Sequence, residues 1–466
     1  MSSPVEGRIL VLGLGRSGAA AAEVLTEAAG EDGPIDAVGV VDEGRSEALE
    51  CEADRLRAMG VDVRVGTSAI EGSWDLVVAS PGIPPGSELM AAARGLGVPI
   101  ISEIEMAYRL ASSPFVAVTG TNGKTTVTSL VTHVLGTSGV PAEAVGNIGR
   151  AAARAAVDAG PATVLVTEVS SFQLALTSSF RPRVAVLLNI TPDHLDWHGG
   201  FEAYERDKAK VFANLAGRDV AVVNVDDAGS APYAERLEDA GVRVMRVGLE
   251  GPQVRGAWLQ DGTLVVGGDH GVVELVAADE LRILGEHNVS NALAASVTAL
   301  EMGALPEGVR EGLRTFAPIE HRLEPVDWVD GVEYFNDSKA TNPDATMKAL
   351  TAFAGRPLVL LLGGRNKGND FVDLARRAPE SCTAVVVFGE AASEIARDFE
   401  GTDVRLVRAD SMREAVREGG TLAEEGDAVL LSPACASFDE FAGGYEERGR
   451  AFKEEVAALA VGGGVA

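Results

Sequence analysis

Short runs of β-branched and other apolar residues alternate with alanine-rich stretches of helical character along most of the chain. This alternation is typical of parallel strands that are connected by helices. Strands are expected at RILVLG, DAVGVVD, DLVVAS, FVAVTG, TVLVTE, VAVLLN, DVAVVN, VEYF, LVLLLGG, TAVVVFG and AVLLS. Because these are too many strands for one sheet of ordinary size, the pattern predicts an α/β protein with more than one sheet.

The length of 466 residues agrees with this interpretation, since one domain commonly takes roughly 150 residues. Two short breaks precede new sets of strands, at Ser112–Pro114 and at Ala317–Pro318. We therefore expect three domains, at residues 1–112, 113–317 and 318–466.

The charge balance narrows the classes of partner. Asp and Glu number 69 against 40 Lys and Arg, which gives a net charge of −29 without any basic run. Such a chain repels nucleic acids and anionic membrane surfaces at long range, so neither is expected as a partner. The three cysteines form no CxxC pair, and no long apolar segment or secretion signal is present, so we expect a cytoplasmic protein.

A glycine-rich turn follows the first expected strand. Gly13 and Gly18 frame a GxGxxG sequence, and Asp42 closes the second strand. Backbone N–H groups at such a turn can face a phosphate while the acid meets a sugar hydroxyl. Ser80 and Gly82 add another loop to the same edge. On its own the motif suggests a dinucleotide-binding oxidoreductase, and the less favoured alternative is a turn that serves only helix–strand packing. We therefore expect a nucleotide or a nucleotide sugar at this edge, without its type being settled by the motif.

The second domain opens with a variant phosphate-binding loop between a strand and a helix. Val118 replaces the Gly or Ala of the strict motif. Lys124 is expected to reach the β- and γ-phosphates of a nucleotide, and Thr125 to hold Mg²⁺. The expected ATP-binding loop comprises Gly120, Thr121, Asn122, Gly123, Lys124, Thr125 and Thr126.

Further polar groups follow strands of the same domain. Glu168 ends TVLVTE and is a natural Mg²⁺ ligand, and Ser170 after it could equally cap a helix. His194 lies in the strand-end segment NITPDHLD, where a functional role is favoured. By residue chemistry alone, Lys208 on an acidic helix is a solvated surface group. Adenine recognition or helix capping are both compatible with Asn288.

Clusters of hydroxyl, amide and cationic groups follow the strands of the third domain. They occur around Asp337 and Lys339, around Lys367, and around Ser437. Because the carboxyl ends of parallel strands are where ligands gather, these clusters predict a site for a small acidic molecule.

Eight segments, in order, together resemble the Mur ligases of peptidoglycan assembly, and among them the branch that adds D-glutamate. The segments are GTNGKTT, EVSSFQL, NITPDHLD, GEHNVSNALAA, HRLE, NDSKATNPDAT, GGRNK and LLSPACASFDEF. The resemblance implies an N-terminal Rossmann-like domain for UDP, a central P-loop ATPase with a mostly parallel sheet, and a C-terminal Rossmann-like domain for the amino acid. It also implies the reaction, in which ATP phosphorylates the carboxylate of UDP-N-acetylmuramoyl-L-alanine and D-glutamate attacks the acyl phosphate.

The resemblance also implies roles for particular residues. Lys124, His194 and Lys208 would be catalytic, with Lys208 carbamylated, and two Mg²⁺ ions would be held by Thr125, Glu168, His194 and Lys208. Besides the loop, ATP would be bound by Asn288, Asn291, Arg322 and Asp337. The UDP substrate would contact Gly15, Arg16, Ser17, Asp42, Ser80, Gly82, Asn147 and Ser170. Glutamate would contact Lys339, Thr341, Lys367, Ser437, Phe438 and Tyr445. A monomer is expected.

Two other classes of function stay open from the residues. The GxGxxG turn with Asp42 suggests an NAD-dependent oxidoreductase that carries an additional ATPase domain. The phosphate-binding loop also fits a nucleotide-dependent switch or motor without covalent chemistry. Nicotinamide binding would favour the first, and ATP turnover independent of any amino acid the second.

Overall fold

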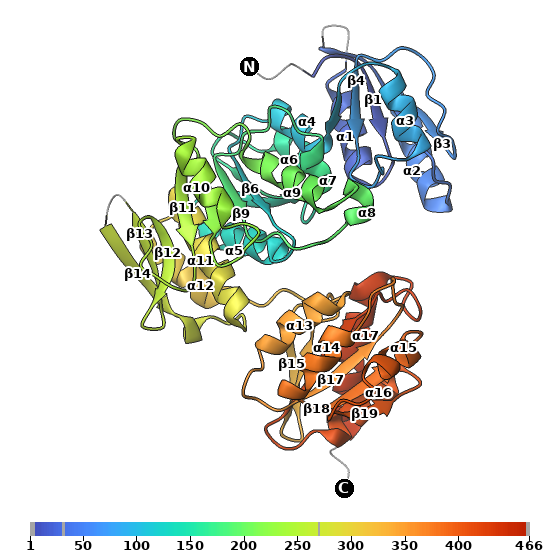
Figure 1. Ribbon diagram of the computed structural model, residues 1–466. Helices are drawn as coiled ribbons and strands as arrows, with labels where there is room; N and C mark the ends of the chain where they lie inside the picture. The colour runs from blue at the N-terminus through green and yellow to red at the C-terminus, as the bar shows by residue number, and fades with distance from the viewer. Residues whose placement is uncertain (1–4, 30–32, 269–270, 463–466) are drawn as a thin grey trace. The chain divides into compact units, whose positions relative to one another are not determined.

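The computed structural model describes residues 5–29, 33–268 and 271–462, and its three sheets carry helices on their faces (Figure 1). The residues form two compact units, residues 1–280 with 290–315 and residues 281–289 with 316–466. The first unit contains two sheets and the second contains one. The predicted α/β class is therefore confirmed, while the boundaries of three domains stay a prediction.

The N-terminal sheet has the strand order β3-β2-β1-β4-β5, and every pair in it is parallel. This is the classic strand order of a doubly wound nucleotide-binding fold, 3-2-1-4-5-6, without its sixth strand. Strand β1 is buried because it consists almost entirely of apolar residues. The elements are β1 (Gly7–Leu12), α1 (Arg16–Glu27), β2 (Ile35–Asp42), α2 (Glu47–Ala58), β3 (Asp62–Val65), β4 (Leu76–Ala79), α3 (Glu88–Gly95), β5 (Ile100–Ser102) and α4 (Glu103–Leu110).

The central sheet has the order β14-β13-β12-β11-β10-β9-β6-β8-β7. It is parallel from β12 to β7, and the antiparallel strands β13 and β14 extend it at one edge. Strands β6, β8 and β9 are fully buried, as their unbroken apolar runs predict. The strands are β6 (Phe115–Thr119), β7 (Ala142–Gly146), β8 (Val164–Glu168), β9 (Val184–Leu187), β10 (Val220–Asn224), β11 (Arg243–Val247), β12 (Gly256–Gln260), β13 (Thr263–Gly268) and β14 (Gly271–Ala277).

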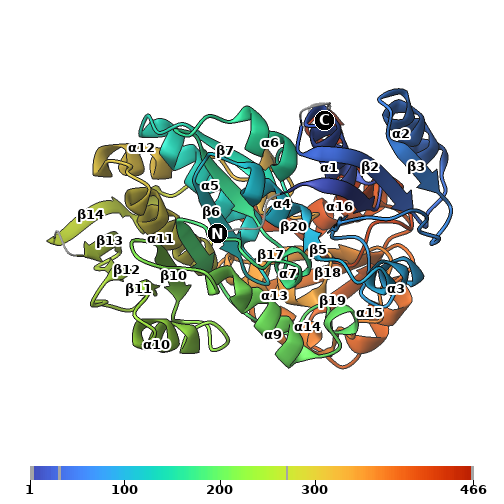
Figure 2. The same ribbon diagram turned by 90° about the horizontal axis from the view of Figure 1, so that it is seen from above.

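Helices cover this sheet, and α5 lies beside β6 and β7 when the molecule is seen from above (Figure 2). The helices of this part of the chain are α5 (Lys124–Thr137), α6 (Ala152–Asp158), α7 (Ser171–Ala175), α8 (Leu195–His198), α9 (Phe201–Ala209), α10 (Pro232–Asp239), α11 (Glu286–Glu301) and α12 (Pro306–Thr315), with 3₁₀ turns at Lys210–Phe212 and Ala278–Glu280. None of the described helices is long and apolar enough to cross a membrane.

The sheet of the second unit has the order β15-β16-β20-β17-β18-β19, in which only β15 and β16 pair antiparallel. Strands β17 and β20 lie in its middle and are buried along their whole length. The elements are β15 (Glu324–Val329), β16 (Val332–Asn336), α13 (Pro343–Thr351), β17 (Leu358–Gly363), α14 (Val372–Arg377), a 3₁₀ turn at Ala378–Glu380, β18 (Cys382–Phe388), α15 (Ala392–Asp398), β19 (Arg405–Arg408), α16 (Met412–Leu422), β20 (Ala428–Ala434) and α17 (Gly444–Gly462).

Candidate active site

The predicted phosphate-binding loop connects β6 to the start of α5. Gly120 and Gly123 have backbone φ values of +157° and +84°, which residues other than glycine rarely adopt. A Cβ atom on Gly123 would also lie 2.7 Å from Oδ1 of Asn291. The loop and Asn291, which were both predicted to bind ATP, are therefore neighbours within the first unit.

Side chains from the next strand end and from α9 fix the loop. Oδ1 of Asn189 accepts a hydrogen bond from the backbone N–H of Asn122 at 2.8 Å, and its amide donates to the Asn122 carbonyl at 3.1 Å. The hydroxyls of Thr121 and Tyr204 lie 2.8 Å apart. Polar groups from two other segments thus hold the loop's shape, as a site that must present fixed N–H groups requires.

Two lysine amines converge on one carbonyl of the loop. Nζ of Lys124 donates to the carbonyls of Gly120 and Thr121 at 2.9 and 2.8 Å, and Nζ of Lys208 donates to the same Gly120 carbonyl at 2.8 Å. Only 2% of Lys208 is exposed, so the interpretation of this residue as a solvated surface group was wrong. The acidic residues around Lys208 predicted an exposed helix, but the face of α9 that carries Lys208 lies against the loop.

Burial, and then the nearby charge of Lys124, hold the pKa of the Lys208 amine well below its usual range, although Asp193 opposes them. The amine also lies 4.6 Å from the centre of the Tyr204 ring. A lysine in these surroundings can lose its proton and become a nucleophile, which a solvated lysine does far less readily.

Glu168 ends β8 beside the loop and is 2% exposed. Its Oε1 accepts a hydrogen bond from the Asn147 amide at 2.7 Å, while its buried Oε2 has no hydrogen-bond partner. A buried carboxylate oxygen without a partner is costly, and a cation would remove that cost. Across the described parts of the chain, no three His, Cys, Asp or Glu side chains gather as a metal-binding group. The Thr125 hydroxyl and ligand oxygens would have to complete the coordination.

Two histidines near this edge differ in their surroundings. The predicted residue His194 has an exposed side chain, and its Nε2 lies 3.5 Å from Asp193. His198, which the sequence analysis did not single out, has a buried side chain between Asp207 and the Ser171 hydroxyl, each at 2.9 Å. The signal in the sequence that could have pointed to His198 was its position four residues, about one helical turn, after His194.

Local hydrogen bonds account for two residues that were predicted to contact the UDP substrate. The Ser170 side chain caps α7 in a reciprocal box with Gln173, so the capping alternative for Ser170 is confirmed. The Asp42 carboxylate accepts from the backbone N–H groups of Leu14 and Gly44 at 2.6 and 2.7 Å. Asp42 therefore shapes the glycine-rich turn. The turn also requires glycine at position 18, because a Cβ atom there would lie only 1.9 Å from the Gly13 carbonyl oxygen.

Arg16 connects this turn to the central sheet. Its guanidinium donates to the carbonyls of Gly146, Asn147 and Gly149 at 3.1, 3.3 and 3.2 Å. Since Asn147 in turn donates to Glu168, the structure brings three predicted site residues into one chain of contacts. Of the other predicted UDP contacts, Gly15 caps α1, Ser17 is half-buried, Ser80 is buried behind Gly13 and Gly82 is exposed in a turn.

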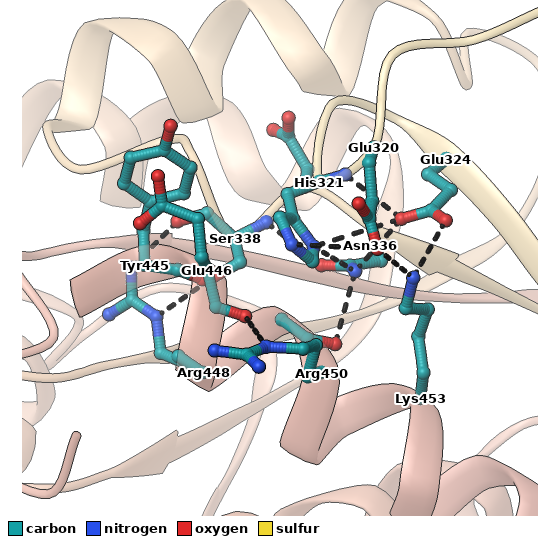
Figure 3. Close-up of polar contacts among 12 residues, drawn as sticks. Glu320, His321, Glu324, Asn336, Ser338, Tyr445, Glu446, Arg448, Arg450 and Lys453 are labelled. Carbon is teal, nitrogen blue, oxygen red and sulfur yellow. Dashed lines mark hydrogen bonds and ion pairs between the residues drawn. The ribbon is translucent and has the colours of Figure 1, made fainter. Parts of the chain in front are cut away.

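The strand ends of the second unit hold a buried polar cluster (Figure 3). Asp337 accepts from the Ser432 hydroxyl at 2.8 Å and from the Leu323 N–H at 3.2 Å, and burial raises its pKa to about 7. His321, at a φ of +64°, lies 2.9 Å from the Asn336 amide. Arg322 is partly buried beside this cluster and contributes to the field at Asp337.

The predicted glutamate contacts are only partly grouped. The Lys339 amine lies 5.0 Å from the centre of the Tyr445 ring, so these two residues are together. Ser437 is buried, Thr341 is half-buried, and Lys367 and Phe438 are exposed on their loops. The amide of Asn288 donates to the Leu284 carbonyl at 2.8 Å within the same unit.

Comparison with known proteins agrees with this geometry. The model of the Mur ligase middle domain matches residues 118–299, and that of the Mur ligase glutamate ligase domain matches residues 321–435. The UDP-N-acetylmuramoylalanine–D-glutamate ligase of Pelotomaculum thermopropionicum is 44% identical to this chain, over 98% of both chains. The chain belongs to the Mur ligase family. The enzyme of the same name from Geobacillus kaustophilus is 41% identical over 96% of both chains.

Solved structures of other Mur ligases share the fold. The MurF ligase of Thermotoga maritima in complex with ADP superimposes with a TM-score of 0.61, at 17% identity, over 91% of this chain and 96% of that one. A pseudomurein peptide ligase from Methanothermus fervidus gives a TM-score of 0.60 at 18% identity, over 97% and 99%. The Mur ligase fold is therefore kept at identities that say nothing about substrates.

Proposed function

We propose that this Mur ligase adds D-glutamate to UDP-N-acetylmuramoyl-L-alanine at the expense of ATP, in the synthesis of peptidoglycan precursors. The observation that carries the proposal is the phosphate-binding loop, where Lys124 and the buried Lys208 share the Gly120 carbonyl beside the unpartnered oxygen of Glu168. Relatives that bear the name of this ligase over nearly the whole chain support the choice of substrates.

The chemistry follows from the substrate. A carboxylate resists attack by an amine because of its resonance and charge, so transfer of the γ-phosphoryl group of ATP to the alanine carboxylate supplies a leaving group. The D-glutamate amine then attacks the acyl carbon, and phosphate leaves as the amide forms. Phosphoryl transfer requires mainly positioning and neutralisation of charge, which the N–H groups of the loop and the ammonium of Lys124 would supply.

Mg²⁺ fits the residues present because Oε2 of Glu168 is buried without a partner. Glu168, the Thr125 hydroxyl, His194 and a modified Lys208 are the groups that would hold two such ions. Bound Mg²⁺ neutralises negative charge on the phosphoryl group as it is transferred. Asn147 orients Glu168 by its hydrogen bond to the other carboxylate oxygen.

Lys208 would act as a carbamate. Its nitrogen, in the neutral form that burial favours, would form a bond to the carbon of CO₂ and release a proton, which leaves one negative charge on the new group. A positively charged Lys208 would repel Lys124, whereas the negatively charged carbamate would attract it. It also turns the buried amine into an oxygen ligand of the kind that Mg²⁺ prefers.

The remaining roles rest on the family motifs. Asn291 borders the loop in the first unit and would contact ATP. That Asn288, Arg322 and Asp337 also contact ATP stays a prediction. The turn at Gly15, Arg16 and Ser17, with Ser80 and Gly82, would bind the UDP part. Lys339, Thr341, Lys367, Ser437, Phe438 and Tyr445 would bind D-glutamate. We further propose that the enzyme acts as a monomer in the cytoplasm.

Phosphate release by the purified protein tests the proposal. It should require ATP, Mg²⁺, UDP-N-acetylmuramoyl-L-alanine and D-glutamate together, and L-glutamate should not replace D-glutamate. Absence of release with the full mixture would overturn the proposal. Release from ATP alone at the same rate would instead indicate a nucleotide-driven switch.

A further inference from the structure

Arg448 in α17 is a fully buried arginine, with 0% of its surface exposed. Its guanidinium donates to the hydroxyl and the carbonyl of Ser338 at 3.0 and 2.8 Å (Figure 3). It also donates to the carbonyls of Gly363 and Cys435 at 3.3 and 3.0 Å, which makes four hydrogen bonds. Every one of these acceptors is neutral. Among the described residues, no carboxylate forms an ion pair with Arg448.

The acceptors lie at the ends of three adjacent strands. Ser338 follows β16, Gly363 ends β17, and Cys435 follows β20, and these strands are neighbours in the sheet. The loops after β17 and β20 also pair directly, since Arg365 and Ala436 exchange backbone hydrogen bonds at 2.7 and 3.0 Å. One guanidinium therefore ties three strand ends into a single surface.

Each of these loops carries a residue proposed to bind the amino acid. Lys339 directly follows Ser338, Ser437 is two positions after Cys435, and Lys367 is four positions after Gly363. Tyr445 is three residues before Arg448 on α17, and its carbonyl accepts from the Ser338 hydroxyl at 2.8 Å. Each acceptor of Arg448 is thus at most four positions along the chain from a residue proposed to bind the amino acid.

The charge of this group is uncompensated at close range. Carbonyl dipoles lower the cost of burying the guanidinium, but they do not cancel its net charge. Burial lowers its pKa to about 10, so it remains charged at neutral pH. Asp337 and Asp439 interact with it only through longer-range electrostatics. A ligand with two carboxylates at the strand ends would meet a fixed positive charge behind the loops.

We propose that Arg448 is a positioning residue for the incoming dicarboxylate amino acid. It fixes the loops after β16, β17 and β20 in the arrangement that binds the acid, and its charge favours an amino acid with a second carboxylate over a neutral one. This inference rests on the proposed function and assigns Arg448 to the amino-acid step alone, not to the binding of ATP or of the UDP substrate.

The test compares Arg448→Met and Arg448→Lys with Arg450→Met in the full-length enzyme. Arg450 is exposed on the same helix and donates only to the Glu446 carbonyl at 3.3 Å, so it is a matched control. Arg448→Met should raise KM for D-glutamate about tenfold or more, while KM for ATP and for the UDP substrate stays within about twofold. Arg448→Lys, which keeps the charge, should recover part of the loss, and Arg450→Met should resemble the wild type.

A second readout separates positioning from folding. Preference for D-glutamate over D-glutamine should fall in Arg448→Met and be kept in Arg448→Lys. If Arg448→Met folds but changes all three KM values alike, or lowers only kcat, the assignment is wrong. If Arg448→Met does not fold, a D-glutamate KM in Arg448→Lys equal to that of the wild type would overturn it, because a lysine cannot reproduce the planar fork that holds the three loops. A wild-type enzyme that is inactive with D-glutamate would contradict the proposed function itself.

Discussion

Lys208 in the first unit and Arg448 in the second are both buried cations, but their surroundings differ. The Lys208 amine has one carbonyl acceptor, the ring of Tyr204 and the repulsive charge of Lys124. The Arg448 guanidinium has four neutral acceptors on three strand ends. Lys208 is held where losing its proton is favourable, whereas Arg448 keeps its charge.

The difference teaches what burial does to each side chain. A lysine in a poorly compensated site can become a reactive amine, and the oxygen of Glu168 beside the same loop has no hydrogen-bond partner, as expected of a group that a bound cation would complete. An arginine whose donors are largely satisfied becomes a fixed structural charge. The first arrangement suits chemistry, and the second suits the orientation of a substrate.

The strongest test of this comparison is Lys208→Ala. It should lower kcat by about a thousandfold or more because a proposed metal ligand is lost, and a small carboxylate such as formate should restore part of the activity. Phosphate release measures both effects. Lys210→Ala is the control, since that amine contacts the Ala175 carbonyl and Asp207 away from the loop. Equal activity of the two variants would remove Lys208 from the metal site.

Glu168→Gln removes the charge beside the loop without changing its shape. We expect about a hundredfold loss of activity at low Mg²⁺, part of which returns at high Mg²⁺, because the amide is a weaker ligand than the carboxylate. Activity measured as a function of Mg²⁺ concentration checks this. A loss that Mg²⁺ does not alter would mean that Glu168 serves only to hold Asn147.

Arg16 resembles Arg448 in donating to backbone carbonyls, but it is exposed. The comparison therefore predicts a smaller effect, with Arg16→Met lowering kcat/KM for the UDP substrate about tenfold. The control is Arg154→Met, because Arg154 also connects the two sheets of the first unit, through its ion pair with Glu27. If both variants lose activity equally, the contact between the sheets matters and the carbonyls of the 146–149 segment do not.

Glu103 extends the comparison to a buried acid. Its Oε1 accepts from the Ala153 N–H at 2.6 Å, its Oε2 has no partner, and burial raises its pKa from 4.5 to about 7. The folded protein then binds more protons than the unfolded chain between these pH values. Stability should fall as the pH rises from about 4.5 through 7, by about 3 kcal/mol at most.

Glu103→Gln should remove this slope, so thermal melting from pH 5 to pH 8 should show wild type losing stability relative to the variant. Arg16 and the start of α6 are the groups that oppose the shift. Glu88→Gln, an exposed position at the start of α3, is the control. Parallel melting curves for wild type and Glu103→Gln would show that the acid is not perturbed.

The sequence predicted the buried strands of the fold well and its edges poorly. Strands such as β6, β17 and β20 are unbroken apolar runs, and the structure places them in the middle of their sheets. Strands β11 and β19 read RVMRV and RLVR, with an arginine at the first and fourth positions, so they form neither an unbroken apolar run nor an alternating pattern. Such short polar strands are set by pairing with a neighbour, which local pattern does not contain.

For the site, residues within one motif were predictable and residues assembled by tertiary contacts were not. The loop from Gly120 to Thr126 carries its geometry in its own sequence. Arg448 and His198 became visible only when α17 and α8 were packed against distant segments. Residue chemistry alone wrongly placed Lys208 on the surface. Its burial depends on packing against the loop after β6, which is distant in sequence.

The link from Arg16 through Asn147 to Glu168 has a consequence for inhibitor design. Arg16 starts α1 in the turn proposed to bind the UDP part, yet its hydrogen bonds end on the segment that orients the proposed metal ligand. If both proposals hold, a compound that draws Arg16 away from these carbonyls would disturb the proposed phosphoryl-transfer site without competing with ATP. Replacing this arginine to escape the compound would then also lower activity.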